Sequence, residues 1–156
     1  MTKELRPGDR APPFKLPTDG GSEISTAQLK GKPFIVYFYP KDDTSGCTKE
    51  AISFTEEKRK FDSLGVEIIG ISKDTAASHE KFKKKYKLGI TLGSDSEIKV
   101  AQAYGVWVEK SLYGRRYMGM ERATFLIDAK GVIKQIWRKV RVPGHVAAVL
   151  EAARTL

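Results

Sequence analysis

The stretch Phe34-Ile35-Val36-Tyr37-Phe38-Tyr39 is an almost unbroken run of apolar and aromatic residues. Such a run is typical of a central strand that is buried on both faces of a sheet. A helical pattern over 45–64 follows it, ends at Gly65, and leads into a second apolar run over 66–71. A strand, a helix and a strand in this order form a parallel pair with a right-handed crossover. These three segments therefore predict an α/β fold.

The rest of the chain adds elements on both sides of this unit. Towards the N-terminus, Thr18-Asp19-Gly20-Gly21 predicts the turn of a short hairpin between 14–16 and 23–25. The C-terminal part predicts helices over 76–87 and 98–104, followed by an irregular segment over 106–120 with a basic turn at Gly114-Arg115-Arg116. A hairpin of 124–128 with 132–137 comes next. The last helix opens at Pro143 and has Val146, Val149 and Leu150 on its core side. We therefore predict a thioredoxin-like fold, in which helices flank a mixed central sheet preceded by an N-terminal β-hairpin, in one domain of residues 1–156.

Composition and charge narrow the class of protein. Hydrophobic residues make up 40% of the 156 residues and charged residues 30%, as in ordinary globular proteins. No run reaches the length of a membrane span, and Met1–Pro7 lacks the apolar core of a signal peptide. A single cysteine fits a reducing compartment, so we expect a cytoplasmic protein without a membrane partner.

The net charge of +9 raises the question of a nucleic-acid partner. The basic runs lie in different predicted elements and match no nucleic-acid-binding motif: Lys58-Arg59-Lys60, Lys83-Lys84-Lys85 and Arg138-Lys139. We interpret them as solvated faces and expect no nucleic-acid partner.

Cys47 is the only cysteine, and it stands where the first apolar run passes into the predicted helix. The backbone N–H groups of a helix's first turn point at such a sulfur, and the helix dipole favours a negative charge there. A thiolate is therefore one interpretation, and a small buried apolar residue is the other.

The residues around Cys47 follow the pattern Pro-x-x-x-Thr-x-x-Cys, with Pro40, Thr44 and Cys47 at the fixed positions. In this pattern the chain resembles the peroxiredoxins. Further blocks are similar to the Q-type branch of that family, also called the bacterioferritin comigratory proteins: 37–41, 46–51, Gly105-Val106-Trp107 with Glu109-Lys110-Ser111, and 122–128. The resemblance extends from about Gly8 to the last helix.

The resemblance implies a thiol peroxidase that reduces hydrogen peroxide and organic hydroperoxides. The Cys47 thiolate would attack one peroxide oxygen, and the sulfur would become a sulfenic acid. A more acidic thiol is also a weaker nucleophile, so the site must mainly stabilise the charge that grows on the leaving oxygen. No cofactor is implied. We also expect no metal, because His79 and His145 have no second ligand at metal spacing.

The same resemblance assigns site residues. Arg122 corresponds to the active-site arginine, Thr44 to the motif threonine and Pro40 to the proline that shields the sulfur. Backbone N–H groups at Gly46 and Cys47 would complete the cradle. The alternatives are a helix cap for Thr44, a surface ion pair for Arg122 and a strand end for Pro40.

Three further residues are pocket candidates, each with a second interpretation. Tyr39 is expected in the core with its hydroxyl in reach of the site. Glu50 either tethers an arginine or a loop near the site or is solvated. Trp107 is favoured as a packing residue over a substrate contact.

The chain departs from the Q-type pattern at positions that matter for recycling. Ser45 stands where the branch usually has proline, and Val108 where it usually has glycine. Many members carry a second cysteine at the position of Ile52 or near Lys84, and neither position holds one here. The resemblance is thus to a one-cysteine variant, reduced by an external thiol such as thioredoxin or glutathione with glutaredoxin. We expect a monomer, with a dimer as the alternative.

Two other classes of function fit parts of the pattern. A disulfide oxidoreductase of the thioredoxin type needs Cys-x-x-Cys, but Thr44 occupies the first cysteine position and Ala123 stands where such proteins commonly have proline. A nucleic-acid-binding or holdase module on the same fold would use the basic surface instead of Cys47.

Overall fold

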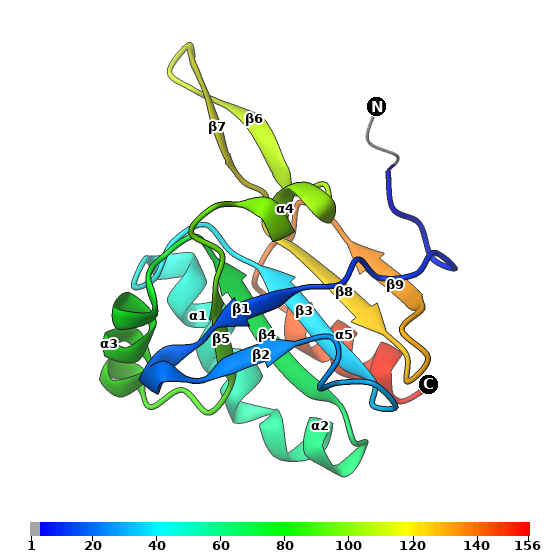
Figure 1. Cartoon of the computed structure of the whole chain (residues 1–156). Helices are drawn as coiled ribbons and strands as arrows, with labels where there is room; N and C mark the ends of the chain where they lie inside the picture. The colour runs from blue at the N-terminus through cyan, green and yellow to red at the C-terminus, as the bar shows by residue number, and fades with distance from the viewer. Residues whose placement is uncertain (1–3) are drawn as a thin grey trace.

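The computed structural model describes residues 4–156, so Met1–Lys3, part of the stretch predicted to lack a signal peptide, lie outside it. A five-stranded mixed sheet forms the centre, in the order β5-β4-β3-β8-β9 (Figure 1). Its strands are β3 (Phe34–Phe38), β4 (Glu67–Ser72), β5 (Thr91–Ser94), β8 (Ala123–Ile127) and β9 (Ile133–Trp137). The strands β3, β4 and β5 are parallel, whereas β8 runs antiparallel to β3 and β9 antiparallel to β8.

Both faces of β3 are covered, as its apolar run predicts. Phe34, Val36 and Phe38 belong to the core beneath β1 (Lys15–Pro17), β2 (Glu23–Ser25) and α4 (Lys99–Ala103). Ile35 and Tyr37 belong to the core on the other face. That face packs against α1 (Ser45–Glu56), α2 (Lys58–Ser63), α3 (Ala76–Tyr86) and α5 (His145–Ala153). The thioredoxin-like α/β fold and the parallel pair are confirmed.

The helix predicted over 45–64 is wrong in one respect, because it is two helices separated at Glu57. Thr55 Oγ1 donates to the Ala51 carbonyl at 2.8 Å and accepts from the Gly89 N–H at 3.2 Å. Threonine bonded back to the preceding turn bends a helix. The second piece still places Phe61 in the core, and Gly65 follows it with a positive φ of 72°.

The irregular segment predicted over 106–120 is also wrong. It is a regular hairpin of β6 (Trp107–Leu112) and β7 (Arg115–Met120). Its two-residue turn is Tyr113-Gly114, with φ of 51° and 79°, the pair of positive values that a tight hairpin turn requires. Arg115 and Arg116 therefore lie in a strand, and only Gly114 of the predicted basic turn is in the turn.

Other differences are smaller. The sequence interpretation missed β5, a four-residue strand, and placed the start of α5 at Pro143, whereas the helix begins at His145 after Gly144 takes a positive φ. The N-terminal hairpin is confirmed, with a 3₁₀ turn, η1 (Asp19–Gly21), between its strands. Val146, Val149 and Leu150 are buried as predicted.

Within residues 4–156, no helix combines the length and the hydropathy that crossing a membrane requires.

Candidate active site

Cys47 lies in the first turn of α1, just beyond the carboxyl end of β3. Thr44 precedes the helix in an extended conformation, and its carbonyl accepts the N–H of Thr48 at 2.8 Å. The N–H groups of 45–47 come before this first helical bond, so the helix leaves them without a partner within its own ladder. Cys47 itself is 1% exposed. A negative charge on this sulfur therefore faces the positive end of α1.

Arg122 contacts this sulfur although it lies 75 residues away in the sequence. It lies between β7 and β8, and its Nη2 donates to Cys47 Sγ at 3.4 Å. Its Nη1 donates to Glu50 Oε1 at 2.7 Å. The structure thus joins three predicted site residues, and the surface ion pair considered for Arg122 and the solvated position considered for Glu50 are both wrong.

The charges of this unit depend on one another. The Glu50 side chain is 0% exposed, and burial raises its pKa from 4.5 to about 7, with the charge and hydrogen bond of Arg122 limiting the rise. Burial works against the charge of Arg122, but Glu50 and then Cys47 outweigh it and raise the pKa of that side chain. Arg122 is therefore a permanent cation, held in a fixed direction by a carboxyl group that changes its charge near neutral pH.

Gly46 makes room for the guanidinium group. A Cβ atom at this position would lie 3.1 Å from Arg122 Nη2, tighter than nine in ten real Cβ contacts. Gly46 is helical, with no positive φ, so the close approach of Arg122 and not the backbone conformation favours glycine here.

The loop before α1 is held by its own polar side chains. Thr44 Oγ1 donates to the Lys41 carbonyl at 2.9 Å and makes no hydrogen bond with the N–H groups of α1, so the helix cap considered for its side chain is absent. Thr44 is exposed and Pro40 half-buried.

Asp42 connects this loop to α3. Its buried carboxylate accepts hydrogen bonds from Tyr39 Oη at 2.6 Å and Ser78 Oγ at 2.8 Å, and it lies 2.8 Å from Nδ1 of the fully buried His79. The Asp42 N–H donates to Asp74 at 2.8 Å. Tyr39 is in the core as predicted, with its hydroxyl directed into this network.

Asp43 makes a second, exposed connection to the same helix. Its carboxylate accepts from Lys85 Nζ at 2.8 Å and Tyr86 Oη at 2.6 Å. The hydrogen bond from Lys85 and then that from Tyr86 lower the pKa of Asp43. Two adjacent residues of the loop are therefore tied to α3.

Three residues near the site were not predicted as site residues from the sequence. Tyr37 has a buried hydroxyl without a hydrogen-bond partner in residues 4–156, and burial, then the charges of Glu50 and Cys47, raise its pKa. His145 Nε2 lies 2.7 Å from Thr124 Oγ1, and burial and then Arg122 lower its pKa to about 4. The third is Lys110 on β6. Its pKa is lowered mainly by burial and, to a smaller extent, by the charge of Arg122.

Trp107 stands apart from the sulfur. It is half-buried at the start of β6, packs against the core on the β1–β2 side of the sheet, and has Lys73 Nζ 5.9 Å from its ring centre. These contacts agree with the packing role that the sequence predicts for it.

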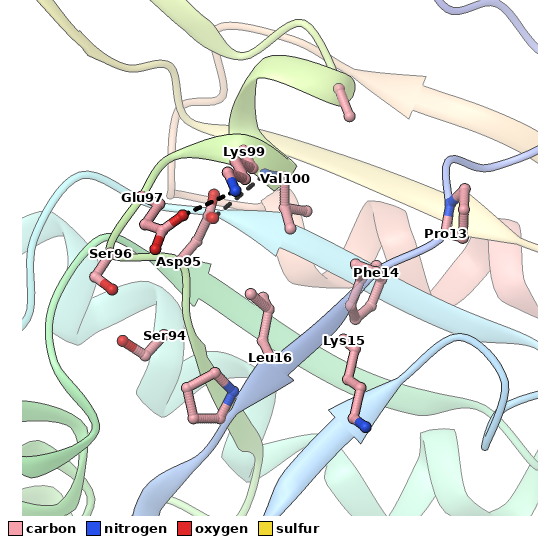
Figure 2. A pocket seen from close by; sticks show the side chains of 12 residues that line it. Pro13, Phe14, Lys15, Leu16, Ser94, Asp95, Ser96, Glu97, Lys99 and Val100 are labelled. Carbon is pink, nitrogen blue, oxygen red and sulfur yellow. Dashed lines mark hydrogen bonds and ion pairs between the residues drawn. The ribbon is translucent and has the colours of Figure 1, made fainter.

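A cavity of about 530 Å³ lies elsewhere, between β1, β5 and α4 (Figure 2). Its buried Asp95 accepts the N–H groups of Val100 at 3.2 Å and Ala101 at 2.8 Å, so this carboxylate caps the start of α4. None of the predicted site residues lines the cavity. Within the described part of the chain, no group of three or more His, Cys, Asp or Glu side chains could hold a metal ion.

Comparisons with known proteins agree with this geometry. The model of the AhpC/TSA family matches residues 7–136. The chain is 52% identical over 143 residues to a Bcp protein of Coxiella burnetii, covering 92% of this chain and 95% of that one. It is 44% identical to peroxiredoxin Bcp of Bacillus subtilis, covering 100% and 98% of the two chains. The solved structure of a peroxiredoxin Q variant from Xanthomonas campestris has a TM-score of 0.88 at 39% identity, covering 91% of this chain and 90% of that one.

A cysteine at the start of α1 that is bonded to an arginine, on a thioredoxin-like fold matched by this family model, defines the class. The chain belongs to the AhpC/TSA family and is a peroxiredoxin, a thiol peroxidase. Within that family it belongs to the Bcp or peroxiredoxin Q branch, and it carries a single cysteine.

Proposed function

We propose that Cys47, Arg122 and Glu50 form the catalytic centre, which reduces hydrogen peroxide and organic hydroperoxides through a sulfenic acid on Cys47. The observation that carries the proposal is the 3.4 Å hydrogen bond from Arg122 Nη2 to Cys47 Sγ at the start of α1. Through this contact, a permanent cation with several N–H donors lies beside the only thiol of the chain, and that thiol is at a helix N-terminus.

The chemical step needs only these groups and the peroxide. The Cys47 thiolate attacks one oxygen, a sulfur–oxygen bond forms and the oxygen–oxygen bond breaks. The second oxygen takes from solvent the proton that the thiol released on ionisation, and it leaves as water or an alcohol. Negative charge grows on the leaving oxygen, and the guanidinium group stabilises it. Glu50 holds Arg122 in position through Nη1, which leaves Nη2 for the reacting atoms.

We propose supporting roles for the other motif residues. The Thr44 hydroxyl donates to Lys41 and keeps lone pairs that can accept a hydrogen bond from the peroxide. Pro40 limits access of water to the sulfur, and the free N–H groups of Gly46 and Cys47 add donors. For Tyr39, whose hydroxyl bonds Asp42, we propose that it positions the loop before α1.

Organic hydroperoxides belong to the proposed substrates for two reasons. Cys47 shares its buried cluster with apolar residues of α1, among them Ala51 and Phe54, so its surroundings suit an alkyl group. The solved structure of the bacterioferritin comigratory protein of Xanthomonas campestris, which has a TM-score of 0.87 and 38% identity to this chain, was studied for its alkyl peroxide reduction activity.

Recycling requires a thiol from outside the chain, because Cys47 is its only cysteine. Thioredoxin, or glutathione with glutaredoxin, would supply it, and a reducing compartment such as the cytoplasm would maintain it. The structure places Ile52 in α1 and Lys84 in α3, the two positions at which a second cysteine occurs in the branch. We propose a monomer as the working form.

Intact mass spectrometry tests the proposal directly. One equivalent of peroxide should add one oxygen to the protein, and thioredoxin with its reductase, or glutathione with glutaredoxin, should remove it. The Cys47→Ser variant should stay unmodified. A wild-type protein that consumes no peroxide, or a Cys47→Ser variant that consumes it equally fast, would refute the proposed centre.

The comparisons give no support to the nucleic-acid-binding or holdase alternative. The basic runs lie on α2, on α3 and beyond β9, in separate parts of the fold. Salt-dependent retention of the protein on a DNA column, compared with its peroxide consumption, measures whether the protein binds nucleic acid.

A further inference from the structure

The hairpin of residues 107–120, here called the arm, projects away from the body of the protein (Figure 1). Its strands β6 and β7 pair with each other and with no other strand of the described chain. A two-stranded hairpin alone is only marginally stable in water, so an arm of this length gains little for the fold from its outer part. Its outer part is therefore available for contact with another molecule.

The arm carries most of the large apolar side chains that face solvent. Five such residues occur within residues 4–156, and four of them are on the arm: Leu112, Tyr113, Tyr117 and Met118. Tyr113, at the tip, is 97% exposed. Exposed apolar side chains that gather on one element are typical of a surface that binds a protein.

The base of the arm leads directly into Arg122, the residue that donates to the reacting sulfur. Trp107 pairs with Met120 at the base, and Arg122 follows two residues later. Lys110 lies close enough to interact with the charges of both Arg122 and Cys47. A molecule bound along the arm beside Lys110 would therefore lie near the Arg122–Cys47 pair.

The charge of this region is positive. The arm holds Lys110, Arg115 and Arg116 against the single carboxylate of Glu109, a net charge of +2. The exposed Lys139 and Arg141 flank Val140, whose N–H donates to the Arg122 carbonyl at 3.0 Å. Such a surface attracts and orients an acidic partner.

We propose that the arm is the docking surface for the protein that reduces Cys47, an acidic protein with a reactive pair of thiols beside an apolar patch. This inference rests on the proposed peroxidase function, since it concerns the second half of that cycle. Because Cys47 is 1% exposed, a protein thiol can reach it only from a partner that is seated closely against this face.

The electron transfer balances without another reactant. The first partner thiol attacks the Cys47 sulfur of the sulfenic acid, the sulfur–oxygen bond breaks, and the hydroxyl leaves with the thiol proton as water. The second partner thiol then loses its proton to solvent and attacks the partner's sulfur in the mixed disulfide, and Cys47 departs as a thiolate. The partner's two thiols are oxidised to a disulfide, and Cys47 is reduced by two electrons.

Two other occupants fit the arm less well. A second copy of the chain would bring one positive arm against another, or against a body whose chain carries a net charge of +9. A nucleic acid would match the arginines and tyrosines, but it offers nothing apolar at its phosphate backbone for Leu112 and Met118 to bind.

The test compares arm variants with two reductants. Leu112→Thr/Tyr113→Asn removes apolar surface, keeps a strand former at 112 and places the favoured Asn-Gly pair in the turn. Arg115→Glu/Arg116→Glu reverses charge. Lys30→Glu/Lys32→Glu is the matched charge reversal, located before β3 at the end of the sheet away from Cys47. The reductants are an acidic thioredoxin kept reduced by its reductase, and dithiothreitol.

We expect kcat/KM for thioredoxin to fall about tenfold to hundredfold in both arm variants and to stay unchanged in the Lys30/Lys32 control. Oxidation of Cys47 by peroxide and its reduction by dithiothreitol should stay unchanged in all variants. Equal use of thioredoxin by arm variants and wild type would overturn the inference, and so would equal losses with both reductants. A wild-type protein that accepts electrons from dithiothreitol alone would also overturn it.

The other occupants have their own signatures. Salt-sensitive DNA retention, or a dimer, that disappears in the arm variants while thioredoxin turnover persists would overturn the inference in favour of that occupant. A wild-type protein that leaves peroxide unreduced with every thiol would instead refute the proposed function, so the two failures are distinguishable.

Discussion

Replacing Arg122 by methionine should separate its proposed catalytic role from its structural one. Arg122 joins Cys47 through Nη2 and Glu50 through Nη1. Its loss would leave the Glu50 carboxylate, which is 0% exposed, without a counter-charge. Removing one partner of a buried ion pair costs about 3–5 kcal/mol, and this penalty applies while Glu50 is ionised. Losing a donor to the developing charge costs about 10²–10³ in rate.

The double variant Arg122→Met/Glu50→Gln distinguishes the two costs. Glutamine keeps the size of Glu50 and removes its charge, so most of the unfolding free energy should return. The rate of Cys47 oxidation should stay about 10²–10³ below wild type, because no cation then faces the sulfur. Glu50→Gln alone should stay within about tenfold of wild type, since the glutamine oxygen still accepts from Nη1 and Arg122 still donates to the sulfur.

Two measurements decide the outcome. Urea unfolding at pH 8 and pH 5 gives the stability, and stopped-flow oxidation by hydrogen peroxide gives the rate. The single variant Arg122→Met should be least stable at pH 8, where Glu50 is most ionised, and should recover at pH 5. If the double variant regained both stability and rate, Arg122 would act on the reaction only by maintaining the fold, and our reasoning would be wrong.

Three further predictions concern the same site. The unfolding free energy of the wild type should decrease as pH rises from 4.5 through about 7, since the folded state holds the Glu50 proton more tightly than the unfolded chain does, and the loss should be about 3 kcal/mol at about 1.4 kcal/mol per pH unit. In Glu50→Gln this slope, followed by urea titrations across that range, should vanish, and an unchanged slope would contradict the assignment. Gly46→Ala should slow Cys47 oxidation about tenfold by displacing Arg122 Nη2, at 3.1 Å from the new Cβ, yet should not lower thermal stability, because alanine favours the helix by up to about 1 kcal/mol. Thr44→Val should slow the same stopped-flow reaction and Thr44→Ser should slow it less because the hydroxyl remains, so equal rates in the two would argue against a role for that hydroxyl.

The elements that the sequence predicts well are those whose residues are buried. The strands β3 and β4 read as apolar runs because both of their faces are covered, and Val36 and Ile69 are fully buried neighbours in the sheet. The arm was missed for the opposite reason. Neither of its faces packs on a core over most of its length, so it shows no alternation of apolar and polar residues, and its turn, Tyr113-Gly114, is not one of the common hairpin pairs.

In the active site, contacts between residues close in the sequence could be predicted, and contacts between distant residues could not. Glu50 stands three positions after Cys47 on one helix, and this spacing puts both on one face, so its burial could have been expected from the helical period. Arg122 is 75 residues from Cys47, and only the resemblance to a family connected them. The Asp42–His79 pair joins a loop to a helix over 37 residues, and no local pattern in the sequence indicates it.

The two connections from the loop before α1 to α3 have a consequence for motion. An unwinding of α1 that extended into the preceding loop would have to separate Asp42 from the buried His79 and Asp43 from Lys85 and Tyr86 in the same event. The loop and α3 should therefore open as one cooperative unit and lose amide protection together in hydrogen exchange. An oxidised Cys47 would then wait in its enclosed position, and the arrival of a reductant, rather than refolding of the site, would set the pace of each turnover.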